Sequence, residues 1–191
     1  MQRPANSPSA PGSAQRSAPR RLRTPLYTPE ERVRRDTSGW TLVQGILAPV
    51  QFLVFAVSLV LVLRFLATGE GLAWANASVV VKTLTLYTIM VTGCIWEKVV
   101  FGRYLFAPAF YWEDVFSMLV LALHTAYLLA LATGALAPQA LMLLALAAYA
   151  AYVINAVQFV LKLRAARLDE AADRAANQEA PRHHSQQEAT A

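Results

Sequence analysis

The 191 residues are too apolar for an average soluble domain, because 56% are hydrophobic, 15% are charged and the mean hydropathy is +0.37. The net charge of +5 comes mainly from the two ends of the chain, so we do not expect nucleic-acid binding. The single cysteine, Cys94, excludes an internal disulfide, and no Cys/His group has zinc-binding spacing. Between Trp40 and Leu161 the charged residues are Arg64, Glu70, Lys82, Glu97, Lys98, Arg103, Glu113 and Asp114.

The N-terminal segment, residues 1–36, is rich in Pro, Ser, Ala and Arg. It lacks the short apolar core and the cleavage site of a signal peptide, so the first apolar run is interpreted as an uncleaved anchor. The composition predicts a disordered basic arm on the cytoplasmic side of a membrane.

Four stretches have the length of roughly 20 apolar residues that a helix needs to cross a bilayer. They cover about 43–66, 77–99, 113–132 and 139–162. Because backbone groups in lipid must be satisfied within the segment, these stretches are predicted to be helices that end near Gly69 and Gly134. The expected fold is all-α: a transmembrane four-helix bundle over residues 37–168, followed by a polar tail over 169–191 whose beginning prolongs the last helix.

Basic residues mark one side of this bundle. Arginines precede the first span, Lys98 and Arg103 separate the second and third, and Lys162, Arg164 and Arg167 follow the fourth. The excess of positive charge predicts that both termini lie in the cytoplasm. Arg64 and Lys82 lie near the opposite ends of their spans, and are interpreted as side chains that extend to water along the helix.

Polar residues inside the spans fall on helical stripes that a bundle can turn inward. The third span carries Glu113, Ser117, Val120, His124 and Tyr127; the second carries Thr83, Tyr87, Met90, Cys94 and Glu97; the first and fourth carry Gln44, Gln51, Ser58, Tyr152, Asn155 and Gln158. The plainer interpretation is that such groups only hydrogen-bond to neighbouring helices. Lys98 and Arg103 likewise satisfy the positive-inside rule without any further role. Acidic residues are not needed for topology, so Glu97, Glu113 and Asp114 are the strongest candidates for function.

His124 follows Glu113 by 11 residues, which puts it about 16 Å deeper along a helix. Ligation of haem by two histidines is excluded, because the other histidines, His183 and His184, lie in the polar tail. Two readings stay open: a core histidine satisfied by a neighbour, or a single axial ligand to a metal tetrapyrrole.

Three blocks of the chain carry a resemblance to a known family: "WTLVQGILAPVQFLVF", "IMVTGCIWEKVVFGRYLFAPAFYWEDVFSMLVLALHTAYL" and "YVINAVQFVLKLRAARL". Over roughly residues 36–168 they closely resemble the 3-vinyl (also called 2-vinyl) bacteriochlorophyllide hydratases of photosynthetic bacteria. The resemblance implies a multi-pass enzyme of the bacterial inner (photosynthetic intracytoplasmic) membrane. It would add water to the ring vinyl group of chlorophyllide or bacteriochlorophyllide without a cofactor and work beside other enzymes of bacteriochlorophyll synthesis.

Hydration of a vinyl group needs an acid for the terminal carbon and a positioned water for the carbon next to the ring. Burial disfavours the charged form of a carboxylic acid, so an acid beside an apolar pocket can stay protonated at neutral pH. Glu97, Glu113 and Asp114 are therefore the expected catalytic residues, with Glu113 or Glu97 as the proton donor.

Substrate binding is expected from Lys98 or Arg103, which would pair with the ring carboxylate, and from His124, Tyr152 and Asn155 deeper in the bundle. No metal is expected to be bound by the protein alone, although His124 is a candidate axial ligand to the magnesium of the substrate. These expectations conflict, because a carboxylate held at the basic loop sends the vinyl group deep, whereas the acidic residues lie at the surface. The alternative functions are a non-catalytic pigment-binding or assembly protein and, less favoured, a small transporter.

Overall fold

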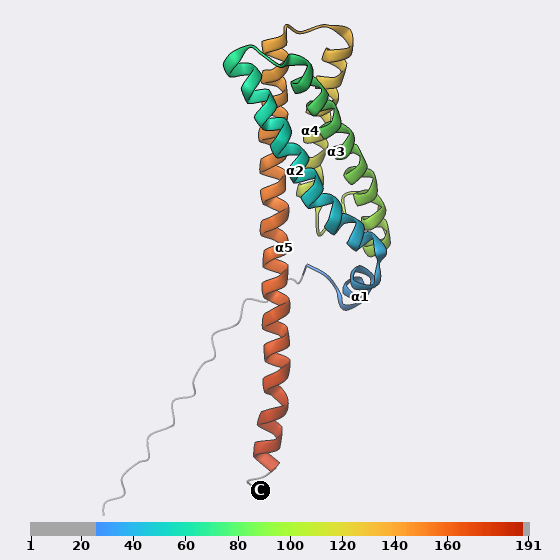
Figure 1. Cartoon of the computed structure of the whole chain (residues 1–191). Coiled ribbons are helices and arrows are strands. Elements are labelled where there is room, and N and C mark those ends of the chain that lie inside the picture. Colours follow the sequence, from blue (N-terminus) through green and yellow to red (C-terminus); the bar gives the residue numbers. More distant parts are fainter. Residues whose placement is uncertain (1–25, 189–191) are drawn as a thin grey trace, which may run out of the picture.

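The computed structural model describes residues 26–188, and these are helical apart from short connections (Figure 1). The helices are α1 (Pro29–Thr37), α2 (Gly39–Thr68), α3 (Leu72–Phe101), α4 (Tyr111–Thr133) and α5 (Pro138–Glu188). Helices α2, α3 and α4, together with Pro138–Ala172 of α5, are long and apolar enough to cross a membrane. The prediction of four membrane-spanning helices is therefore confirmed at the level of length and composition.

Each helix extends somewhat beyond the apolar stretch that predicted it, because a helix ends at a backbone signal and not where hydropathy falls. Ser38 caps α2 by accepting a hydrogen bond from the Trp40 amide at 3.2 Å. Helices α2, α3 and α4 stop at Gly69, Gly102 and Gly134, which have φ values of 75°, 79° and 63°. Glycine adopts this left-handed conformation without a steric penalty.

Helix α5 continues without a break past the expected end of the fourth span and through the expected polar tail to Glu188. The segment after Leu168 is rich in Ala, Arg, Glu and Gln, which favour helix. Figure 1 shows α5 projecting well beyond the other helices at the end of the bundle where α1 lies.

Helix α1 differs from the expectation that residues 1–36 form a disordered arm; residues 1–25 of that arm lie outside the described part of the chain. Thr28 and Glu31 form a reciprocal capping box, with the Thr28 amide donating to Glu31 at 2.8 Å and the Glu31 amide donating to Thr28 at 3.3 Å. Arg35 anchors the helix through a 2.8 Å ion pair with Glu170 of α5. Burial alone would lower the pKa of Arg35, but hydrogen bonds to Asp36 and Glu170 outweigh it and raise that pKa.

The bundle consists of two helical hairpins, α2–α3 and α4–α5, each packed closely along its length, with sparser packing between α3 and α4. Helices α2 and α5 run antiparallel and pack together, as Figure 1 shows. Large apolar side chains such as Leu53, Val60 and Leu129 are exposed on the outside of the bundle. In a helix of this length, such a surface is suited to lipid. Polar side chains such as Ser58, Thr83 and His124 are buried in the interior.

Candidate active site

The acidic residues at the junction of α3 and α4 are buried: Glu97 is 6%, Glu113 8% and Asp114 4% exposed. Glu97 lies in the last turns of α3, and Asp114 lies in the first turn of α4. The carboxyl groups of Glu97 and Asp114 accept hydrogen bonds from two consecutive amides of one loop, so they lie close together. Two buried carboxyl groups at close range resist ionising together, because their negative charges repel each other. Glu97 and Asp114 therefore form an acid pair that is suited to keeping a proton.

The loop between α3 and α4 closes over this acid pair. The Phe106 amide donates to Asp114 Oδ2 at 2.7 Å, and the Ala107 amide donates to Glu97 Oε2 at 3.4 Å. Phe106 has a φ of 58°, and among the described residues it is the non-glycine residue with positive φ. Backbone strain of this kind is maintained only where the surroundings enforce it. The strained loop supplies the pair with donors that favour one ionised carboxylate.

Glu113 belongs to a different interaction. Its Oε2 atom accepts a 2.6 Å hydrogen bond from Nζ of Lys162 on α5. The structure thus separates the three predicted catalytic residues into a carboxyl pair, Glu97 and Asp114, and an ion pair, Glu113 and Lys162. Because Glu113 is engaged by the Lys162 amine, Glu97 is the better candidate for the proton donor.

A layer of amide and hydroxyl groups lies one turn deeper than the acid pair. Asn155 donates from Nδ2 to Ser117 Oγ at 2.8 Å. The carbonyl oxygens of Asn155, Gln51 and Gln158 are buried and have no hydrogen-bond partner among the described residues. Phe55 of α2 packs on Tyr152 of α5, with 5.0 Å between the ring centroids. Gln51 and Asn155 each lie about one helical turn from this contact, both toward the acid pair, because the two helices are antiparallel. Unpaired buried acceptors at one level are suited to binding water.

A third polar layer lies deeper still and corrects two expectations. Lys82 does not extend to water: it is fully buried, and its Nζ atom lies 2.9 Å from Nε2 of His124. It is about 15 Å from the start of α3, too far for its side chain to reach the helix end. His124 Nδ1 donates to the Val120 carbonyl at 2.8 Å, so both ring nitrogens are engaged. In this arrangement His124 offers no free nitrogen to a magnesium ion.

The aromatic residues around Lys82 complete this layer. Lys82 Nζ lies 4.0 Å from the ring centroid of Tyr152 and 5.8 Å from that of Tyr149. Tyr149 in turn contacts Ser58, with 2.5 Å between the hydroxyl oxygens. Tyr152, which the sequence places in the substrate site, thus forms a cation–π contact with a lysine that the sequence analysis assigns to the surface.

The two basic loop residues remain outside the bundle. Lys98 is exposed, donates to the Gly102 carbonyl at 2.9 Å and lies 5.2 Å from the centroid of the Tyr104 ring. Arg103 is also exposed. Lys98 therefore caps the C-terminus of α3, where a positive charge interacts favourably with the helix dipole. Neither residue contacts the buried polar layers.

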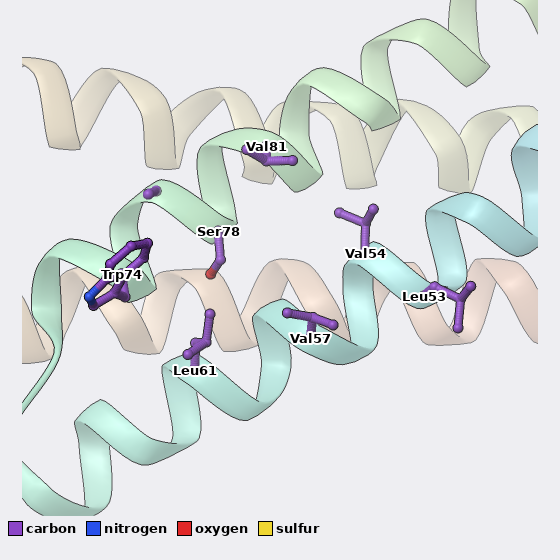
Figure 2. A pocket seen from close by; sticks show the side chains of 8 residues that line it. Leu53, Val54, Val57, Leu61, Trp74, Ser78 and Val81 are labelled. Atoms are coloured by element: carbon purple, nitrogen blue, oxygen red, sulfur yellow. The ribbon is translucent and has the colours of Figure 1, made fainter.

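An apolar groove lies away from the acid pair. Figure 2 shows an apolar groove of about 400 Å³ between α2 and α3, lined by Leu53, Val54, Val57, Leu61, Trp74, Ala77, Ser78 and Val81. Its lining on α3 ends 16 residues before Glu97, about 24 Å along the helix. The groove is therefore not part of the acidic site. Among the described residues, no group of His, Cys, Asp and Glu forms a metal site.

These features define a class: an integral membrane protein with four apolar helices that enclose buried acid, amide and lysine–histidine layers. The family model for 2-vinyl bacteriochlorophyllide hydratase matches residues 27–165, and the chain belongs to this family. It is 72% identical over 145 residues to the 2-vinyl bacteriochlorophyllide hydratase of Cereibacter sphaeroides, covering 75% of this chain and 89% of the relative. Its identity to the Rhodobacter capsulatus enzyme of the same name is 64% over 167 residues, covering 87% and 92%.

No solved structure matches the chain. The family and these relatives establish a hydro-lyase, a hydratase of bacteriochlorophyll synthesis. This agrees with the activity that the resemblance in the sequence implies.

Proposed function

We propose that the protein adds water to the ring vinyl group of chlorophyllide a or 3-vinyl bacteriochlorophyllide and produces the 3-(1-hydroxyethyl) derivative. The printed names of the relatives specify a vinyl bacteriochlorophyllide as what they hydrate. The observation that carries the mechanism is the buried acid pair, because the Glu97 and Asp114 carboxyl groups accept from consecutive amides of the loop that closes over them.

In the first step the protonated member of the Glu97–Asp114 pair transfers its proton to the terminal carbon of the vinyl group. The carbon–carbon double bond becomes a single bond, and positive charge develops on the carbon attached to the macrocycle, which delocalises it. The ionised carboxyl pair then faces this cation. Opposite charges attract strongly in a site that excludes water, so the pair stabilises the same charge that its proton transfer creates.

In the second step a water oxygen bonds to the cationic carbon, and one water proton returns to the carboxyl pair. The substrate gains one water molecule, and no group is oxidised or reduced. The unpaired carbonyl oxygens of Gln51 and Asn155 are the groups we assign to holding this water. The Glu113–Lys162 ion pair, next to Asp114 in the chain, positions the acid pair from α5.

The site would open to the cytoplasm. Arg34, Lys98 and Lys162 all lie at the end of the bundle that carries the acid pair, and this distribution supports a topology with both termini inside. We infer that the lipid-exposed helices sit in the bacterial inner membrane and its photosynthetic intracytoplasmic extension. There the apolar substrate would arrive through lipid and the product would pass to other enzymes of the pathway.

Two orientations of the ring follow from the available cations. If Lys98 or Arg103 pairs with the substrate carboxylate, the vinyl group points away from the acid pair, toward Tyr152, Asn155 and His124. If the carboxylate is held in the deep layer, the vinyl group points toward Glu97. The acid mechanism requires the second orientation.

The test is hydration by the purified protein in detergent, with chlorophyllide as substrate and isotopically labelled water as solvent. We expect the pigment to gain the mass of one labelled water, with the label in the new hydroxyl group. Mass spectrometry of the extracted pigment measures this. Pigment that is bound by the protein but recovered at its original mass would contradict the proposal and favour the pigment-binding alternative.

A further inference from the structure

Lys82 is a buried amine without an acidic partner among the described residues. Its side chain is fully buried, and no acidic group in residues 26–188 lies within 4.0 Å of it in an ion pair. Of the three hydrogens of its ammonium group, one is directed to His124 Nε2 and one face meets the Tyr152 ring. His124 cannot supply the missing charge, because its imidazole is at most neutral or cationic. Buried lysines are normally paired with an anion, since an uncompensated charge in an apolar interior is costly.

The acid pair contrasts with this layer, because it has two carboxyl groups and backbone donors around them. The two layers are joined along the contact between α3 and α4. Lys82 and Glu97 are on α3, while His124 and Asp114 are on α4. On α4, the separation of His124 and Asp114 is 10 residues, about 15 Å. The α3–α4 contact therefore has a buried lysine at its deep end and an acid pair at the other end.

Between these ends the interior is apolar. Leu86 and Val120 are buried there, and Ile89, Met90 and Leu121 pack against them. The order along the α3–α4 contact is thus a lysine, an apolar stretch and an acid pair. The proposed substrate has the complementary order: a carboxylate, a flat apolar ring, and a vinyl group on the opposite side of that ring. The contact between α3 and α4 is also sparser than that between α2 and α5, so a flat ring can enter there with less loss of packing.

We propose that Lys82 binds the carboxylate of the substrate, so that the ring lies along the α3–α4 contact with its vinyl group directed to the Glu97–Asp114 pair. His124 is a positioning residue, because it holds the lysine amine through Nε2 while Nδ1 is fixed by the Val120 carbonyl. This inference rests on the proposed function and assigns the orientation that the acid mechanism requires. It replaces Lys98 and Arg103 as the carboxylate-binding groups.

The experiment compares the free acid of the substrate with its methyl ester, which keeps the ring and the vinyl group but lacks the charge. The KM and kcat of hydration are measured for both pigments with the wild-type chain, Lys82→Met and Lys98→Met. Lys98→Met is the matched control, because it makes the same substitution on the same helix at the competing cation.

We expect the wild-type KM for the acid to be about tenfold below that for the ester, the difference that one charge-assisted contact provides. Lys82→Met should remove this preference by raising the KM for the acid, while the KM for the ester changes little. Lys98→Met should keep the preference. Lys82→Arg, which retains the charge, should retain part of the preference and shows that the effect is not one of misfolding.

The inference is overturned if the wild-type chain hydrates both pigments with the same KM, if Lys82→Met still prefers the acid, or if Lys98→Met loses the preference. The first outcome would be expected of a neutral Lys82 amine that needs no anion. Failure of the proposed function has a different signature, because the wild-type chain would then add water to neither pigment.

Discussion

The two ends of the polar interior treat charge in different ways. At the end near the α3–α4 loop, Glu97, Asp114 and Glu113 are surrounded by backbone amides and by Lys162. In the deep layer, Lys82 has only a histidine and aromatic rings. The first arrangement is complete in the protein alone, as expected of groups that exchange protons with water. The second arrangement is short of an anion, as expected of a binding site that is completed by its ligand.

The largest expected effect comes from changing the acid pair. Glu97→Gln keeps the shape of the side chain but removes its acid proton, so we expect the hydration rate to fall by about 100-fold to 10,000-fold. Initial rates of hydroxyethyl product formation measure the change. Glu70→Gln is the control, because Glu70 is 77% exposed and its contact to Arg64 is 3.9 Å long. A Glu97→Gln rate within a few-fold of wild type would remove the carboxyl pair from the mechanism.

A second test removes the contact between Lys82 and His124 in the deep layer. His124→Leu leaves the buried Lys82 amine without its hydrogen-bond acceptor, and we expect it to lower the free energy of unfolding in detergent by about 2–3 kcal/mol. The double variant with Lys82→Met should recover much of the loss, because it removes the stranded polar group as well. Denaturant titration followed by circular dichroism gives both values.

Thr125→Val is the control for the deep test. It removes a neutral hydrogen bond to Tyr87, one residue further along α4, where the two hydroxyl oxygens are 2.8 Å apart. We expect its cost to be about 1 kcal/mol. If His124→Leu costs no more than this control, the Lys82–His124 contact is an ordinary interhelical hydrogen bond.

The smallest expected effect concerns the docking of α1 against α5. Arg35→Gln loses the 2.8 Å ion pair to Glu170, which is partly buried, and should lower the free energy of unfolding by about 1 kcal/mol. Arg64→Gln, at the exposed 3.9 Å contact, should change it by less than about 0.5 kcal/mol. Equal effects of the two substitutions would show that α1 does not stabilise the acid end of the bundle.

The inward stripe of α4 shows what periodicity can predict. Glu113, Ser117, Val120, His124 and Tyr127 were expected on one face, and all of them are buried. On α3 the expected stripe through Thr83 and Tyr87 is displaced by one residue in its deep half. There the buried face runs through Lys82 and Leu86, although Thr83 is buried too. The prediction from polarity put Thr83 inside and Lys82 outside, because a lysine is expected to avoid an apolar interior.

The sequence by itself determined the four apolar helices and the glycines that end three of them, since these depend on local composition. It also determined the family, which is carried by contiguous sequence motifs. Tertiary structure alone decided which polar groups meet. Glu97 lies with Asp114 on consecutive loop amides, Glu113 binds Lys162, and Lys82 turns inward to His124. The physical reason is that pairing depends on the rotation and tilt of helices whose contacts are many residues apart in sequence, and on where a buried charge finds its partner.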